Sequence, residues 1–240
     1  MSELTQEGKG LKGSKFLFQQ LVNDKQASLN YAILSSSPSL MGFIKHKDSF
    51  QWKSPLKELA YKEFRNELLE LEDSWTINKD LLKEYWPAMG PQWDGIAIVE
   101  GKDGKKGLLL VEAKAHIKEM RSQIQAKGES RLLIEKTINE VKNYFHSSEP
   151  LDTWINQYYQ LSNRLAFLYI LNQKMEIPAW LVLTNFVDDQ SHISTSLESW
   201  MGHYIEVFDQ MGLNSSKCHL INNVITIFPE LNETWLTKKG

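Results

Sequence analysis

The sequence contains a single cysteine in 240 residues, and this scarcity excludes several classes of protein. A lone Cys218 can form neither an internal disulfide nor a cysteine-based metal cluster, so a reducing cytoplasm is the expected location. The N-terminus lacks the apolar core of a signal peptide. No stretch approaches the roughly 18 consecutive apolar residues of a membrane helix. Secretion and membrane spanning are therefore not expected.

Several enzyme signatures are also missing. The chain has no P-loop, no G-x-G-x-x-G turn and no G-x-S-x-G nucleophile motif, which removes support for nucleotide-dependent motors, Rossmann dehydrogenases and α/β-hydrolases. What is present is ordinary for a globular chain, with 42% hydrophobic and 24% charged residues. Residues 1–14 are rich in Gly, Lys and polar groups and predict a flexible arm, and residues 15–240 predict a single domain.

The net charge is -3, but basic and acidic residues are concentrated in different segments of the chain. The balance is +4 over residues 1–62, -6 over 63–100, +4 over 101–142 and -5 over 143–240. The total argues against strong nonspecific binding of nucleic acid, whereas the basic segments allow a local track of phosphate contacts.

Hydrophobic periodicity predicts an α/β chain with a mixed central sheet flanked by helices, and with extra N- and C-terminal helices. Helices are expected over about residues 15–33, 55–72, 78–85, 130–145, 151–173 and 195–212. Strands are expected over 93–100, 107–116, 178–186 and 223–228. The helix after Ser54-Pro55 has apolar positions at spacings of three and four, namely Leu56, Ala60, Phe64, Leu68 and Leu71. No clean strand is visible within residues 73–92.

A predicted β-hairpin carries the most informative residues. Glu112 and Lys114 share one face of its second strand, because side chains alternate along a strand. A turn centred on Asp103 places Asp94, on the first strand, opposite Glu112, with Cβ atoms about 4.5–5.5 Å apart. Two carboxylates this close repel each other, and a divalent cation is the simplest remedy. Oxygen ligands favour Mg²⁺ or Mn²⁺ over zinc.

The alternative interpretation of Asp94, Glu112 and Lys114 is a structural ion-pair cluster within the sheet. It is less favoured, because burying such a cluster seldom gains net stability.

The same residues resemble a known signature. W-D-G at 93–95 followed by E-A-K at 112–114 is similar to the D…(D/E)-x-K pattern of the PD-(D/E)xK, or restriction-endonuclease-like, nuclease superfamily. W-I-N-Q-Y-Y-Q-L-S-N-R-L-A at 154–166 resembles a helix of uncharacterised bacterial members. Trp93 stands where the superfamily usually has proline. The similarity runs from about Gln51 to Phe228 and implies a restriction-endonuclease-like core.

The resemblance implies metal-dependent phosphodiester hydrolysis by a nuclease, with DNA favoured over RNA. Asp94 and Glu112 would hold Mg²⁺ or Mn²⁺ together with the main-chain carbonyl of Ala113. The metal would polarise a phosphate oxygen and activate a water. Lys114 would orient the attacking water and offset charge that builds in the transition state.

The resemblance also implies a carboxylate from the preceding helix. Glu63 is favoured over Glu67 and would bind a second metal or its water, and a solvated helix flank is the other interpretation.

His116 shares the strand face of Lys114, where a hydrogen-bonded structural histidine is favoured over a general base.

On the long helix, Gln157, Gln160 and Arg164 form a polar line at i, i+3 and i+7. That line could contact a scissile phosphate or brace the site, with Gln160 as the best candidate, and a solvated helix face is the alternative.

Beyond the hairpin, a phosphate backbone could follow a run of basic residues, Lys118, Arg121, Lys127 and Arg131. A homodimer is left open, because many enzymes that cut duplexes pair two active sites symmetrically. The rival functions are a catalytically inactive nucleic-acid-binding module and a protein-interaction module on the same fold.

Overall fold

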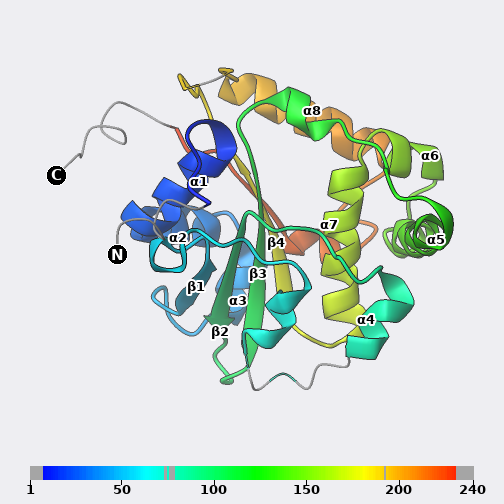
Figure 1. Cartoon of the computed structure of the whole chain (residues 1–240), viewed down its shortest axis with the longest axis horizontal. Coiled ribbons are helices and arrows are strands. Elements are labelled where there is room, and N and C mark those ends of the chain that lie inside the picture. The colour runs from blue at the N-terminus through cyan, green and yellow to red at the C-terminus, as the bar shows by residue number, and fades with distance from the viewer. Residues whose placement is uncertain (1–7, 73–74, 76–78, 192, 231–240) are drawn as a thin grey trace.

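The computed structural model describes residues 8–72, 75, 79–191 and 193–230. Their framework is a mixed five-stranded sheet in the order β1-β2-β3-β4-β5 (Figure 1). The strands are β1 (Phe50–Ser54), β2 (Gly95–Glu100), β3 (Lys106–Lys114), β4 (Ala179–Asn185) and β5 (Val224–Ile227). The β1–β2 and β2–β3 pairs are antiparallel, and the β3–β4 and β4–β5 pairs are parallel.

Helices cover both faces of the sheet. They are α1 (Gly13–Asp24), α2 (Gln26–Ser35), α3 (Pro38–Phe43), α4 (Lys79–Tyr85), α5 (Gly128–Tyr144), α6 (Leu151–Asn156), α7 (Tyr159–Tyr169) and α8 (Leu197–Gln210). Shorter helical turns are η1 (Lys57–Leu59), η2 (Asn66–Glu70), η3 (Ile117–Met120), η4 (Ile170–Lys174) and η5 (His219–Asn223). In the described part of the chain, no helix combines the length and the hydropathy needed to cross a lipid bilayer.

Two hydrophobic clusters lie on opposite faces of the sheet. Leu109, Val111 and Ala113 of β3 pack against α1 to α3, and Leu108 and Leu110 pack on the face of α5 to α8. Every residue of β3 after Lys106 is buried, as expected for a central strand covered on both sides. Glu112 and Lys114 continue the Leu108 and Leu110 series, so alternation directs them toward α7.

The predicted hairpin and its register are confirmed. Gly95 pairs with Val111 and Glu100 with Lys106, which is the register that a turn centred on Asp103 requires. Gly104 has φ +80° in that turn, a left-handed conformation that glycine adopts without strain. The strands predicted over 178–186 and 223–228 are also present, as β4 and β5.

The helix predicted over residues 55–72 is wrong. The segment follows β1 as irregular chain with the short turns η1 and η2, and Ala60 and Tyr61 have positive φ values of 52° and 57°. Phe64 and Leu68, whose spacing suggested a helix, are nevertheless buried in the core, which they reach from irregular chain. β1 is the first strand of the sheet, and it precedes residues 73–92, where the sequence shows no clean strand.

Three other helices differ from expectation. The helix predicted over 15–33 divides at Lys25 into α1 and α2. The helix predicted over 151–173 divides at Gln157, because Ser122 bridges to Tyr158 and donates its N–H to the Gln157 carbonyl, 2.9 Å away. Helix α8 is capped by Ser196, whose Oγ accepts from the N–H of Ser199 at 3.2 Å, and Thr195 lies one residue outside.

Gly95, next to Asp94, allows a close approach of α1 to the sheet. A Cβ at this position would lie 2.3 Å from the Phe18 ring, so we expect Gly95→Ala to lower the free energy of unfolding by about 1–3 kcal/mol. Gly42→Ala is the control, since a Cβ there meets no atom within 4 Å. Urea denaturation measures both, and equal midpoints for the two variants would contradict the expected crowding.

Candidate active site

A pocket of about 400 Å³ opens where β3 ends and β2 begins. Its walls come from the start of α1, the loop after β1, the hairpin, η3 and α7: Ser14, Glu63, Arg65, Pro91, Gln92, Asp94, Glu112, Ala113, Lys114, Glu119, Gln160, Asn163 and Arg164. The pocket brings together six of the residues singled out in the sequence, namely Glu63, Asp94, Glu112, Lys114, Gln160 and Arg164. His116, Gln157 and Glu67 do not line it.

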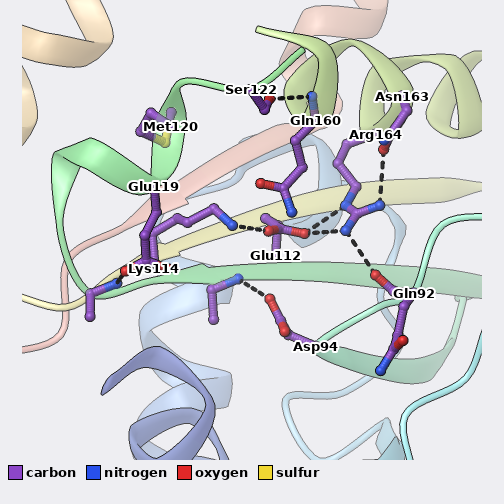
Figure 2. Close-up of polar contacts among 12 residues, drawn as sticks. Gln92, Asp94, Glu112, Lys114, Glu119, Met120, Ser122, Gln160, Asn163 and Arg164 are labelled. Carbon is purple, nitrogen blue, oxygen red and sulfur yellow. Dashed lines mark hydrogen bonds and ion pairs between the residues drawn. The ribbon is translucent and has the colours of Figure 1, made fainter. Parts of the chain in front are cut away.

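Glu112 lies at the centre of the site, and only 5% of its surface is exposed. Lys114 donates from Nζ to Oε1 of Glu112, in a short contact, and Arg164 donates from Nε to Oε2 at 2.6 Å (Figure 2). The Nη2 atom of Arg164 lies 2.5 Å from the same Oε2. Both carboxylate oxygens are therefore bound by side-chain cations.

These cations decide the ionisation of Glu112. Burial opposes the charged carboxylate, but Arg164 and Lys114 outweigh it and hold the pKa of Glu112 below its ordinary value. Glu112 is therefore an anion before any other ligand arrives.

Asp94 stands immediately before β2, and its Oδ2 accepts from the N–H of Ala113 at 2.7 Å. Its own N–H donates to the Val111 carbonyl at 3.2 Å, which continues the hairpin ladder by one residue. Burial, and then the negative charge of Glu112, raise the pKa of Asp94 to about 7. The two carboxylates thus differ in ionisation although they lie side by side.

Arg164 is the best-fixed side chain in the pocket. It is 4% exposed, and Nη2 donates to the Gln92 carbonyl at 2.8 Å while Nη1 donates to Oδ1 of Asn163 at 2.9 Å. Its guanidinium lies 4.5 Å from the ring centroid of the fully buried Trp93. Of the two roles considered for the polar line on this helix, the contacts of Arg164 match bracing of the site.

The other two members of the polar line separate. The side-chain amide of Gln160 points toward Glu112, and the backbone N–H of Gln160 donates to Oγ of Ser122 at 2.8 Å (Figure 2). Gln157 is not part of the pocket and instead accepts from Nη1 of Arg121 at 2.8 Å.

Glu63 reaches the pocket from a loop and not from a helix. The N–H of Trp93 donates to the Phe64 carbonyl at 3.0 Å, which ties the loop to the residue before Asp94. Glu63 is ion-paired through Oε1 with Lys15 at 3.0 Å, and its Oε2 accepts from Nε2 of Gln92 in a short contact. Glu67 lies in a different pocket, so Glu63 is the carboxylate that shares the site.

His116 lies outside the pocket, next to Glu119. It precedes η3, and its N–H donates to Oε1 of Glu119 at 3.2 Å, with Nε2 at 3.4 Å from the same oxygen. It does not line the pocket, whereas Glu119 does.

Sequence reasoning missed several residues that shape the site. Gln92 and Asn163 hold Arg164, and Asn185 of β4 lies beside Lys114 in the sheet. The hydroxyl of Tyr204 donates to Oδ1 of Asn185 at 2.9 Å, and burial raises the pKa of that hydroxyl above its ordinary value. The one available signal was Asn185, an amide within an apolar strand.

The donor set suits a hard divalent cation. Asp94 and Glu112 supply carboxylate oxygens, and the carbonyl of Ala113 leaves β3 on the same side as its N–H, toward Asp94. Within the described residues, no group of three or more His, Cys, Asp or Glu side chains could hold a metal ion. Two carboxylates with room for water and a phosphate are what Mg²⁺ usually receives from proteins.

The raised pKa of Asp94 predicts that this carboxylate destabilises the metal-free fold. The folded chain retains a proton here, between the ordinary value of 3.8 and about 7, that the unfolded chain has released, so this contribution to stability falls as pH rises. In EDTA, we expect Asp94→Asn to gain stability over the wild type as pH rises from 4.5 to 7, reaching roughly 1–4 kcal/mol.

Urea denaturation at several pH values measures that difference, with Asp209→Asn on the exposed surface of α8 as the control. A difference for Asp94→Asn that does not change with pH would contradict the raised pKa.

No family model, no curated protein and no solved structure matches the chain.

Proposed function

We propose that the chain is a metal-dependent nuclease of the PD-(D/E)xK superfamily, with a restriction-endonuclease-like fold, that hydrolyses phosphodiester bonds in DNA. The observation that carries the proposal is the meeting of Asp94, Glu112 and Lys114 at one pocket. Asp94 immediately precedes β2, and the other two share the face of β3 that lines the site. A cytoplasmic location, with which the buried Cys218 thiol accords, belongs to the same proposal.

Asp94, Glu112 and the Ala113 carbonyl would hold Mg²⁺ or Mn²⁺. The ion, when bound, would polarise the phosphate and supply an activated water. Both carboxylates must be ionised to serve as ligands. Glu112 already is, and loss of the proton from Asp94 near pH 7 makes ion binding favoured at neutral to alkaline pH.

Lys114 and Gln160 are the chain's own groups for handling water and phosphate. The ammonium of Lys114 faces the pocket from β3, where it would orient the attacking water and offset the charge that develops on the phosphate. The amide of Gln160 enters from α7 and offers both a donor and an acceptor to the same space.

Basic residues near the pocket support a nucleic-acid substrate more modestly. In the run that follows β3, Lys118, Arg121 and Lys127 are exposed, although Arg121 binds Gln157, and the half-buried Arg131 pairs with Glu135. A short basic run in a chain of net charge -3 predicts weak nonspecific binding.

A second function has one observation in its favour. Both oxygens of Glu112 are already bound by Arg164 and Lys114, as they would be in a purely structural ion-pair cluster. A catalytically inactive nucleic-acid-binding module on the same fold would keep that cluster and bind without cutting.

A cleavage assay separates the two functions. Purified chain with Mg²⁺ or Mn²⁺ should cut fluorescent single- or double-stranded DNA, with RNA tested in parallel. Lys114→Gln should lower the rate by about 10²–10³, because it removes the charge that stabilises the transition state. Lys217→Gln is the control and should cut like the wild type, because Lys217 is exposed and lies outside both the pocket and the basic run.

Full activity in both Lys114→Gln and Asp94→Asn would place the chemistry elsewhere. Salt-sensitive binding without cleavage of any substrate would favour the inactive module.

A further inference from the structure

The carboxylates of the pocket are almost fully engaged by the protein itself. Both oxygens of Glu112 are bound by side-chain cations, and both oxygens of Glu63 are bound by Lys15 and Gln92. Asp94 uses Oδ2 for the N–H of Ala113. Glu119, the fourth carboxylate of the pocket, accepts through Oε1 from the N–H groups of Ala115 and His116. Of the three carboxylates nearest the end of β3, Asp94 keeps an oxygen, Oδ1, to which the described residues make no recorded contact.

The two cations on Glu112 are held very differently. The guanidinium of Arg164 is fixed by the Gln92 carbonyl, the Asn163 amide and the Trp93 ring, so its hold on Oε2 costs little further ordering. Lys114 has a flexible side chain, and its ammonium contacts Oε1 of the same carboxylate. An incoming cation would therefore displace Lys114 and leave Arg164 in place.

We propose that Arg164 is a positioning residue that permanently occupies Oε2 of Glu112, so that the site takes one divalent ion and not two. This inference rests on the proposed metal dependence. The ion would use Oδ1 of Asp94, Oε1 of Glu112 and the Ala113 carbonyl, and Lys114 would move off Oε1 into the pocket. Glu63, held by Lys15 and Gln92, is then part of the pocket wall and not a ligand.

Electrostatics supports the limit to one ion. Arg164 carries a fixed positive charge next to the buried carboxylate of Glu112, and Lys15 neutralises Glu63. A second divalent ion bound through Glu63 would have to break the contacts of that side chain, and it would then lie near two permanent cations and the first ion. Such an arrangement is costly in a partly buried pocket, where charges are poorly screened.

Calorimetric titration of the metal-free chain with Mn²⁺, without nucleic acid, measures how many divalent ions the site binds. We expect one ion per chain for the wild type, no binding for Asp94→Asn, and one ion within about threefold of wild-type affinity for Glu63→Gln. Two ions in the wild type, one of them lost in Glu63→Gln, would overturn the inference and leave the nuclease proposal intact. No Mn²⁺ bound and no cleavage would instead overturn the proposed function.

The role of Arg164 has its own variants. Arg164→Gln frees Oε2 of Glu112, so we expect a second, weaker Mn²⁺ to bind. Arg164→Lys keeps the charge and should bind one ion, as should Arg131→Gln, which removes a half-buried arginine of α5 that is paired with Glu135 outside the pocket. A single ion in Arg164→Gln would overturn the exclusion assigned to Arg164. Circular dichroism checks folding, and if Arg164→Gln does not fold, the wild-type and Glu63→Gln counts decide the inference.

Discussion

The burial of one ionised carboxylate, Glu112, organises the rest of the site. An anion in a central strand loses its hydration, and the loss is tolerable only when cations and hydrogen bonds replace the water. Lys114 supplies one cation from the same strand, and Arg164 supplies the other from α7. The backbone of Gln92 and the ring of Trp93 then hold Arg164, so the segment before β2 is tied to the helix across the pocket.

The hairpin could be predicted because its information is local. The turn residues set the register, and the alternation of β3 sets which face Glu112 and Lys114 share, so their approach to Asp94 follows from a short stretch of sequence. Burial on both faces of β3 and β4 likewise leaves continuous apolar runs that are readable as strands. The superfamily fold drawn from the D…ExK resemblance stays a prediction, whereas the α/β sheet with helices on both faces is seen directly.

The remainder depends on contacts between distant segments. The spacing of Phe64 and Leu68 is compatible with a helix, but two left-handed residues and the hydrogen bond from Trp93 to Phe64 make the segment a loop. Glu63 was therefore placed near the site for the wrong structural reason. The break before α7 likewise comes from Ser122, which is far from that helix in sequence. No periodicity could show that Arg164, three turns into an expected continuous helix, would meet Glu112.

The parallel pairing of β3 with β4 has a consequence for how the site comes apart. Glu112 and Lys114 lie on a central buried strand and pair with β4, so their amides should be among the slowest to exchange with solvent. The loop that carries Glu63 lies outside the sheet and should open locally at a lower free energy. The β3 side of the pocket should therefore stay folded as long as the domain does, whereas the loop that carries Glu63 should open and close while β3 remains in place.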